Sequence, residues 1–118
     1  MSKNPPIPHP LPEGLVELIA QRFRVLGEPM RIRLLDCLRE GPATVGQLQE
    51  ATGGSQQNVS KHLGVLLAAG TVTRQKEGNF VRYEIADPAV FELCEHVCGG
   101  LRRQMEELDV LLAGGSPR

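Results

Sequence analysis

The sequence predicts a small, mainly α-helical domain with one two-stranded β-hairpin between its fourth and fifth helices. Three observations carry this prediction. Apolar residues recur at helical spacing in four short segments between residues 15 and 69. Between residues 71 and 87 the pattern changes to an alternation of period two on either side of a glycine-containing turn. A helical period then returns over residues 89–112, so the expected order of elements is α-α-α-α-β-β-α.

The composition is that of one soluble globular domain. A chain of 118 residues has room for one modest core, and its 41% hydrophobic and 23% charged residues are ordinary proportions. No apolar run approaches the ~20 residues that cross a bilayer, and no charged-then-apolar signal segment opens the chain. We therefore expect a cytoplasmic protein with no membrane partner, whose three cysteines stay reduced.

Two terminal segments lie outside the expected domain. Residues 1–14 are rich in proline and have no periodicity, which predicts a flexible N-terminal arm. Residues 113–118, with the sequence AGGSPR, predict a disordered tail. The folded domain is expected to span residues 15–112.

The first two helices are expected before residue 42. An apolar stripe from Leu15 to Leu26 predicts the first helix, and "GEP" ends it. Pro29 fits the first turn of a second helix, because its missing N–H has no helical partner there. The Gly-Pro pair at 41–42 ends that helix.

The next two helices are joined by a very short turn. Thr44 and Gln47 have the spacing of a capping box, which predicts the start of a short third helix. Glycines 53–54 end it, and Ser55 is an expected N-cap for the fourth helix, which closes at Gly70.

The hairpin and the last helix complete the pattern. In "TVTRQKEGNFVRYEIAD" the segment KEGN is the turn, with Gly78 free to take a positive φ. Asp87 is then an N-cap, followed by a first-turn proline and a helix over 89–112. Two helices joined by a glycine-containing turn, with a β-ribbon after the second, form a winged helix-turn-helix.

Polar side chains fill the first turns of the fourth helix, the recognition helix of such a fold. Gln and Asn can hydrogen-bond adenine N6 and N7 in the major groove, and cations and hydroxyls suit phosphates. Between Ser55 and Tyr83 there are four basic residues and one acidic residue, whereas the remainder holds nine basic and thirteen acidic ones. A solvated polar face is the alternative. The candidate DNA contacts are Ser55, Gln56, Gln57, Asn58, Ser60, Lys61 and His62 on the helix, with Arg74, Lys76, Asn79 and Arg82 in the wing.

At this point the chain resembles a known family. The motifs "LGEPMRIRLL", "TVGQL", "VSKHLGVLLAAGTV" and "EGNFVRYEI" resemble the ArsR-type bacterial repressors, the arsenic-repressor or metal-sensing family, over about residues 15–112. The resemblance implies a homodimeric repressor that binds an inverted-repeat operator in double-stranded DNA and is released by an effector, commonly a metal ion or metalloid. It also implies a dimer interface formed by the first helix, with Leu15 and Leu18, and the last helix.

The last helix predicts a self-packing seam independently of the resemblance. Its apolar residues step by three or four positions and form one stripe, which is typical of a helix that packs against a partner. A plain core stripe is the alternative. The seam residues are Val90, Cys94, Val97, Leu101, Met105, Leu108 and Leu112.

The effector is harder to predict, because two familiar metal sites of the family are not matched. "TVGQL" lacks the family's Cys-x-Cys pair, and downstream of Asp87 the expected histidine position falls near Gly100. Cys94 and Cys98 offer another site. Their Cβ atoms, at i and i+4, are expected ~5–6 Å apart, which is too far for an unstrained disulfide but allows both thiolates to bind one soft ion or trivalent arsenic. Their candidate effectors are arsenite, a thiophilic metal ion or a reactive sulfur or oxidising species.

Several alternatives stay open from the sequence. Cys94 and Cys98 can be small apolar packing residues, and Cys37 is expected in the core, with a third-ligand role as its alternative. No phosphate loop, paired-carboxylate cleft or oriented Cys/His couple is visible, so we do not expect an enzyme. The rival functions are a constitutive DNA-binding regulator without a ligand and a winged helix used for protein–protein contact.

Overall fold

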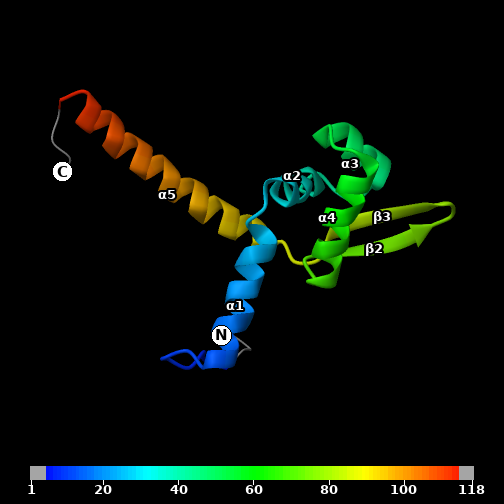
Figure 1. Cartoon of the computed structure of the whole chain (residues 1–118), viewed down its shortest axis with the longest axis horizontal. Helices are drawn as coiled ribbons and strands as arrows, with labels where there is room; N and C mark the ends of the chain where they lie inside the picture. Colours follow the sequence, from blue (N-terminus) through cyan, green and yellow to red (C-terminus); the bar gives the residue numbers. More distant parts are fainter. Residues whose placement is uncertain (1–4, 115–118) are drawn as a thin grey trace. The chain divides into compact units, whose positions relative to one another are not determined.

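The computed structural model describes residues 5–114 and divides the chain into two compact units that join between Ala86 and Asp87 (Figure 1). The N-terminal unit contains α1 (Glu13–Leu26), α2 (Pro29–Leu38), β1 (Ala43–Thr44), α3 (Val45–Thr52), α4 (Gln56–Ala68), β2 (Val72–Glu77) and β3 (Phe80–Ile85). The C-terminal unit contains α5 (Ala89–Leu112). Parts of the predicted arm and tail, residues 1–4 and 115–118, lie outside the described residues.

The helix starts follow the predicted capping chemistry. The hydroxyl of Thr44 accepts from the Gln47 N–H at 3.2 Å, and the Gln47 side chain accepts from the Thr44 N–H at 2.9 Å. Ser55 caps α4 by accepting from the Asn58 N–H at 3.1 Å. Gly53 ends α3 at φ 73°, a conformation that suits glycine because it has no Cβ. The turn between α3 and α4 is therefore set by local sequence.

The sheet has one strand more than predicted. The expected hairpin forms from β2 and β3, but the two-residue strand β1 also pairs with β3, which gives the order β1-β3-β2. Ala43 lies opposite Tyr83, and Thr44 lies opposite Arg82. Two residues are too few to show a period of two, so no sequence pattern could have indicated this strand.

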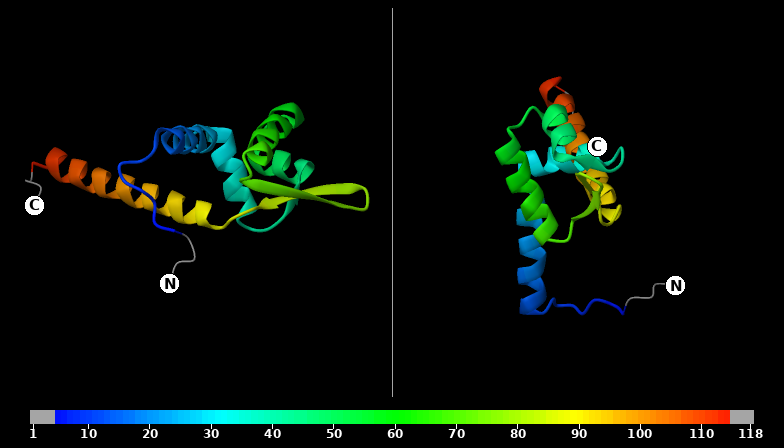
Figure 2. Two further views of the ribbon diagram at one scale, coloured as in Figure 1. Left: turned by 90° about the horizontal axis from the view of Figure 1, so that it is seen from below. Right: turned by 90° about the vertical axis from the view of Figure 1, so that its right-hand side faces the viewer.

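The core lies where α2, α3 and α4 meet the base of the sheet (Figure 2). Its fully buried residues come from each of these elements, and each such side chain stabilises the fold by roughly 1.5–3 kcal/mol. In the left view of Figure 2 the β2–β3 hairpin extends beyond α3 and α4. The largest fully buried side chains are Leu34, Leu48, Val59, Leu63, Leu66 and Val72.

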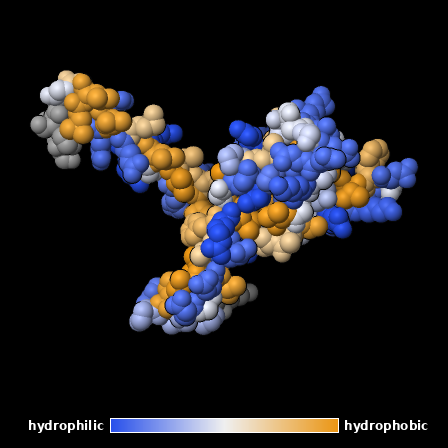
Figure 3. Space-filling model, viewed as in Figure 1, coloured by the Kyte–Doolittle hydropathy of each residue, from blue (hydrophilic) through white to orange (hydrophobic). Residues whose placement is uncertain are grey.

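Helix α5 is unbroken through Gly99 and Gly100, and none of its residues is buried. Its N-cap is Pro88, one residue after the predicted Asp87, whose carboxylate accepts from the Ala89 N–H at 2.9 Å. Figure 3 shows apolar surface along this helix. Five of the predicted seam residues have exposed fractions between 53% and 77%: Val97, Leu101, Met105, Leu108 and Leu112. Within residues 5–114, no helix combines the length and the apolar character needed to cross a membrane.

Candidate nucleic-acid interface

Helix α4 is divided into a packed face and a solvent face. Val59, Leu63 and Leu66 are buried against the core, which fixes the opposite side of the helix toward solvent. The exposed residues of its first two turns are Gln56, Gln57, Ser60 and Lys61, and Asn58 is half-buried. Four of the predicted contact residues therefore lie on one accessible surface.

The start of α4 is chemically suited to DNA. Amide side chains at Gln56 and Gln57 can both donate and accept, as base edges in the major groove require. Backbone N–H groups at a helix N-terminus attract phosphate, and Lys61 adds a positive charge one turn further on. The Ser55 hydroxyl already caps the helix, so its first role is structural.

His62 departs from the prediction. It was expected among the DNA contacts, but its exposed fraction is 7% and its ring lies on the packed face of α4. A step of three residues from Val59 brings it round to the core side, so it belongs to the helix's buried stripe. His62 was predicted to lie on the polar surface because histidine is polar. The helical period of the apolar residues, which puts position 62 on the buried stripe with Val59 and Leu63, was the better guide.

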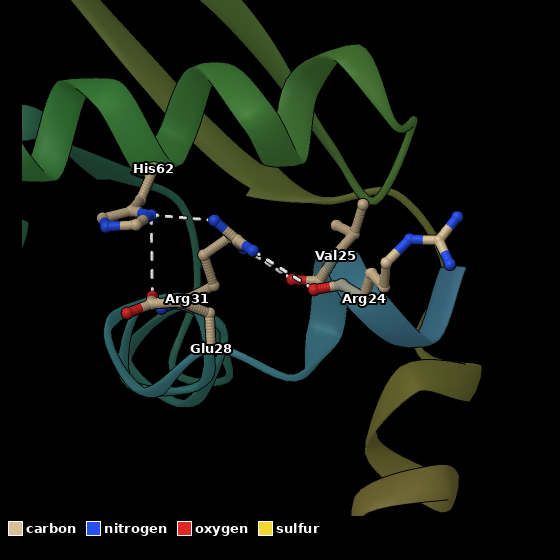
Figure 4. A network of polar contacts seen from close by, with 5 residues as sticks. All are labelled: Arg24, Val25, Glu28, Arg31 and His62. Atoms are coloured by element: carbon tan, nitrogen blue, oxygen red, sulfur yellow. Dashed lines mark hydrogen bonds and ion pairs between the residues drawn. The ribbon is translucent and has the colours of Figure 1, made fainter. Parts of the chain in front are cut away.

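A polar network holds the His62 ring in place (Figure 4). Nη1 of Arg31 lies 3.0 Å from His62 Nδ1, and Oε2 of Glu28 lies 3.6 Å from the same nitrogen. The other Arg31 nitrogens reach the end of α1: Nε donates to the Val25 carbonyl at 2.5 Å and Nη2 to the Arg24 carbonyl at 3.2 Å. We call these contacts the Glu28–Arg31–His62 network.

Glu28 also caps α2. Its carboxylate accepts from the Arg31 N–H at 3.0 Å at the helix N-terminus. Removal from water raises the pKa of this carboxyl, but the hydrogen bond from the Arg31 N–H and the electrostatic interactions with the His62 and Arg31 side chains outweigh that effect. The pKa of Glu28 is therefore held below its ordinary value of 4.5. The network thus favours the ionised form of Glu28.

The register of the wing separates its basic residues onto two faces. Directly opposed residues of an antiparallel pair share a face. Arg74 lies opposite buried Tyr83, and Lys76 lies opposite Val81, so both cations are on the face that carries the core residues at its base. Arg82 lies opposite Gln75, on the other face. Asn79 is exposed at the tip beside Gly78, which has a φ of 61°.

Arg82 differs from the other wing cations in a second respect. Its Nε lies 3.1 Å from the Glu77 carboxylate on the same face of the hairpin. Lys61, Arg74 and Lys76 form no ion pair with another described residue. Because the Glu77 charge offsets that of Arg82, Arg82 is the weaker phosphate contact of the set.

The wing also carries an aromatic residue that the sequence interpretation did not use. Phe80 opens β3, next to Asn79, and its exposed fraction is 63%. A ring at this place can make apolar contacts to sugars or bases alongside the polar wing residues. The signal was visible in the sequence, since Phe80 falls on the face opposite Tyr83.

The two cysteines of α5 lie one turn apart, with Cys94 half-buried and Cys98 exposed. The described residues contain no cluster of three or more His, Cys, Asp or Glu side chains placed to bind a metal ion. Cys37 is half-buried in α2, where burial and then the neighbouring Asp36 carboxylate raise the pKa of its thiol. A protonated, partly packed thiol fits the core role expected for Cys37.

Comparisons with known proteins agree with this geometry. A helix-turn-helix domain model matches residues 26–75. The chain is 38% identical over 109 residues to an uncharacterized HTH-type transcriptional regulator, Rv0081, of Mycobacterium tuberculosis, which covers 88% of this chain and 96% of that protein. The crystal structure of Rv0081 superposes with a TM-score of 0.73 at 37% identity and covers 81% of this chain and 97% of the other.

Two further relatives are informative. A homodimeric winged helix-turn-helix DNA-binding domain, Mb0332 of Mycobacterium bovis, described as a possible ArsR-family regulator, has a TM-score of 0.71 at 25% identity and covers 85% of this chain and 95% of that one. A probable mercury resistance operon repressor of Streptomyces lividans is 38% identical over 74 residues, which is 63% of this chain and 59% of that protein. With its capped helix-turn-helix and its β-hairpin wing, the chain belongs to the ArsR-type winged helix-turn-helix family and is a DNA-binding transcriptional regulator rather than an enzyme.

Proposed function

We propose that the protein is a homodimeric repressor that binds an inverted-repeat operator and is released by a thiol-reactive effector. The observation that carries the DNA-binding part is the exposed polar surface of α4, held by a capped turn and accompanied by the basic residues of the wing. Each protomer would place α4 in one major groove, and the two-fold axis of the dimer would match the symmetry of the operator. We expect it to act in the cytoplasm.

The uncovered seam of α5 supports the homodimer. A continuous apolar stripe on the surface of a single small chain is typical of an interaction site. A partner then covers the stripe in the assembled protein. Leu18 on α1 is also strongly exposed, and Leu15 is half-buried, which fits the expected contribution of the first helix. Mb0332, a relative with the same fold, is homodimeric.

The thiol pair supports the effector part of the proposal. Cys94 lies within the seam and Cys98 lies at its edge, so ligation or oxidation there would act directly on the dimer interface. Soft ions and trivalent arsenic prefer thiolates, and a related repressor is named for mercury resistance, another thiophilic metal. Because the metal displaces the thiol protons, binding should tighten as the pH rises.

The test is a titration of DNA binding against effectors. A duplex selected from a randomised library would be bound by reduced protein and then challenged with arsenite, cadmium, mercuric ion or a persulfide. The double variant Cys94→Ser/Cys98→Ser should bind the duplex but resist release, whereas Cys37→Ser should be released like the unaltered protein. Allosteric couplings of ~1–3 kcal/mol would change DNA affinity about 5- to 150-fold. Release of the double variant at the same effector concentrations would place the sensing site elsewhere. Failure of all effectors to release the unaltered protein would favour a constitutive regulator.

A further inference from the structure

We propose that Arg31 and His62 are positioning residues for DNA recognition: they fix the rotation of α4 so that its exposed amides meet the bases. This inference rests on the proposed role of α4 in reading DNA, and it assigns a function to buried residues that do not contact DNA. Within α4, His62 is the one polar side chain among the four buried residues.

The apolar contacts of α4 do not define its rotation sharply by themselves. Hydrophobic burial is non-directional and depends on the area removed from water, so small rotations about the helix axis cost little. A hydrogen bond has a preferred distance and angle. The contact of 3.0 Å between Arg31 Nη1 and His62 Nδ1 therefore supplies the directional restraint that Val59, Leu63 and Leu66 lack.

Arg31 is itself held rigidly. Its Nε and Nη2 atoms donate to the Val25 and Arg24 carbonyls in the last turn of α1. Carbonyl groups in the last turn of a helix have no N–H of the same helix to accept from, so these two are available to the guanidinium. Its own N–H donates to Glu28. A guanidinium with two fixed partners can orient a third, and the Arg31 backbone is held at Glu28, so His62 is restrained against both α1 and α2.

A close contact restrains the chain just before the start of α4. A Cβ on Gly54, in the turn that precedes α4, would lie 2.9 Å from Cε of Met30 and 3.1 Å from Cγ2 of Val59. The turn thus packs directly on α2 beside the helix start. With the turn and the His62 ring both fixed on α2, the helix has two separate anchors, and Gln57, Ser60 and Lys61 lie between them in the chain.

The His62 ring contributes an acceptor to its contact with Arg31. A guanidinium can only donate, so in this hydrogen bond His62 Nδ1 is the acceptor. The required property is therefore an acceptor at the Nδ1 position. Asn places its amide oxygen close to where Nδ1 lies, whereas Leu fills a similar space with no acceptor.

The experiment compares discrimination with non-specific binding. DNA affinity would be measured at several salt concentrations for the selected duplex and for a scrambled duplex of the same length, with the unaltered protein, His62→Asn and His62→Leu. Discrimination is the ratio of the affinity for the selected duplex to the affinity for the scrambled duplex. Loss of one well-placed base contact should lower this ratio roughly fivefold or more. His62→Leu should lose at least that factor while its affinity for scrambled DNA and its salt slope stay unchanged. His62→Asn should keep most of the discrimination.

Arg31→Lys provides a second route if His62→Leu does not fold. It keeps the positive charge but loses the fork that joins three acceptors, so it should also lose discrimination without changing the salt slope. Full discrimination in a folded His62→Leu or Arg31→Lys variant would overturn the inference, as would equal losses in His62→Leu and His62→Asn. If the unaltered protein does not discriminate between the two duplexes, the proposed function fails instead, and the two failures are distinguishable.

Discussion

Placing a charge in the α5 seam should dissociate the proposed dimer. Leu101 lies at the middle of the stripe and is 54% exposed, so about half of its surface remains for a partner to bury. Full burial of a leucine is worth roughly 1.5–3 kcal/mol, which leaves about 1 kcal/mol per protomer and about 2 kcal/mol per dimer for this position. Leu101→Glu removes that gain and adds the cost of desolvating two carboxylates, several kcal/mol per ion.

The combined effect should exceed about 3 kcal/mol and weaken dimerisation more than 100-fold. Sedimentation velocity between micromolar and hundred-micromolar concentrations would measure it, with circular dichroism to confirm that the variant is folded. Val110→Glu is the matched control, because Val110 is also an exposed apolar residue of α5 but lies about half a turn round the helix from Leu101. It should leave the dissociation constant within a few-fold.

Two outcomes would refute the reasoning. A Leu101→Glu protein that sediments as a dimer with the unaltered dissociation constant would show that the stripe is not the interface. Equal dissociation by Leu101→Glu and Val110→Glu would show that added charge, and not its place on the helix, caused the effect.

The remaining predictions concern the DNA face and the Glu28–Arg31–His62 network. Lys76→Ala should weaken binding to all DNA sequences and flatten the salt slope by about one unit, whereas Arg82→Ala should change both less, because Glu77 already offsets that charge. Electrophoretic or fluorescence titrations across salt would measure both variants, and equal effects would contradict the argument that Glu77 offsets the charge of Arg82. Because the pKa of Glu28 is lowered by folding, its contribution to stability is fully present above about pH 4.5 and is lost as the pH falls through its folded pKa. Glu28→Gln should therefore lower the melting temperature more at pH 7 than at pH 3, and an equal loss at both would show that the charge of Glu28 does not matter.

The parts of the fold that the sequence predicted well are those set by local chemistry. The capping box at Thr44, the Ser55 cap and the positive φ at Gly78 each depend on residues within a few positions. Strand β1 could not be predicted in the same way, since it exists only because β3 passes beside it. Its pairing joins residues about forty positions apart, and no short-range pattern reports such a contact.

In the candidate site, too, features set by the local sequence could be predicted and features set by distant residues could not. The exposed amides of α4 follow from the helical period and could be identified in advance. His62 was misplaced because its polarity was given more weight than the helical period, and its polar partner Arg31 is thirty-one positions away on another helix. The unequal value of the wing cations depends on strand register and on the Glu77 partner. In the composition Arg74 and Arg82 count as equal positive charges. In the structure the charge of Arg82 is offset by Glu77 and Arg74 lies on the other face of the hairpin.

The modest charge of the DNA face makes dimerisation part of the DNA-binding argument. Each protomer presents three cations without an ion-pair partner among the described residues, Lys61, Arg74 and Lys76, on a chain whose formal net charge is −1. Phosphate contacts supply most of the sequence-independent affinity, and so few contacts per protomer supply little of it. Two joined protomers double the contacts, and the second half-site is then bound at a high effective concentration. An effector at Cys94 would therefore need only to alter the α5 seam, because losing the paired geometry removes the second half-site without changing any residue that touches DNA.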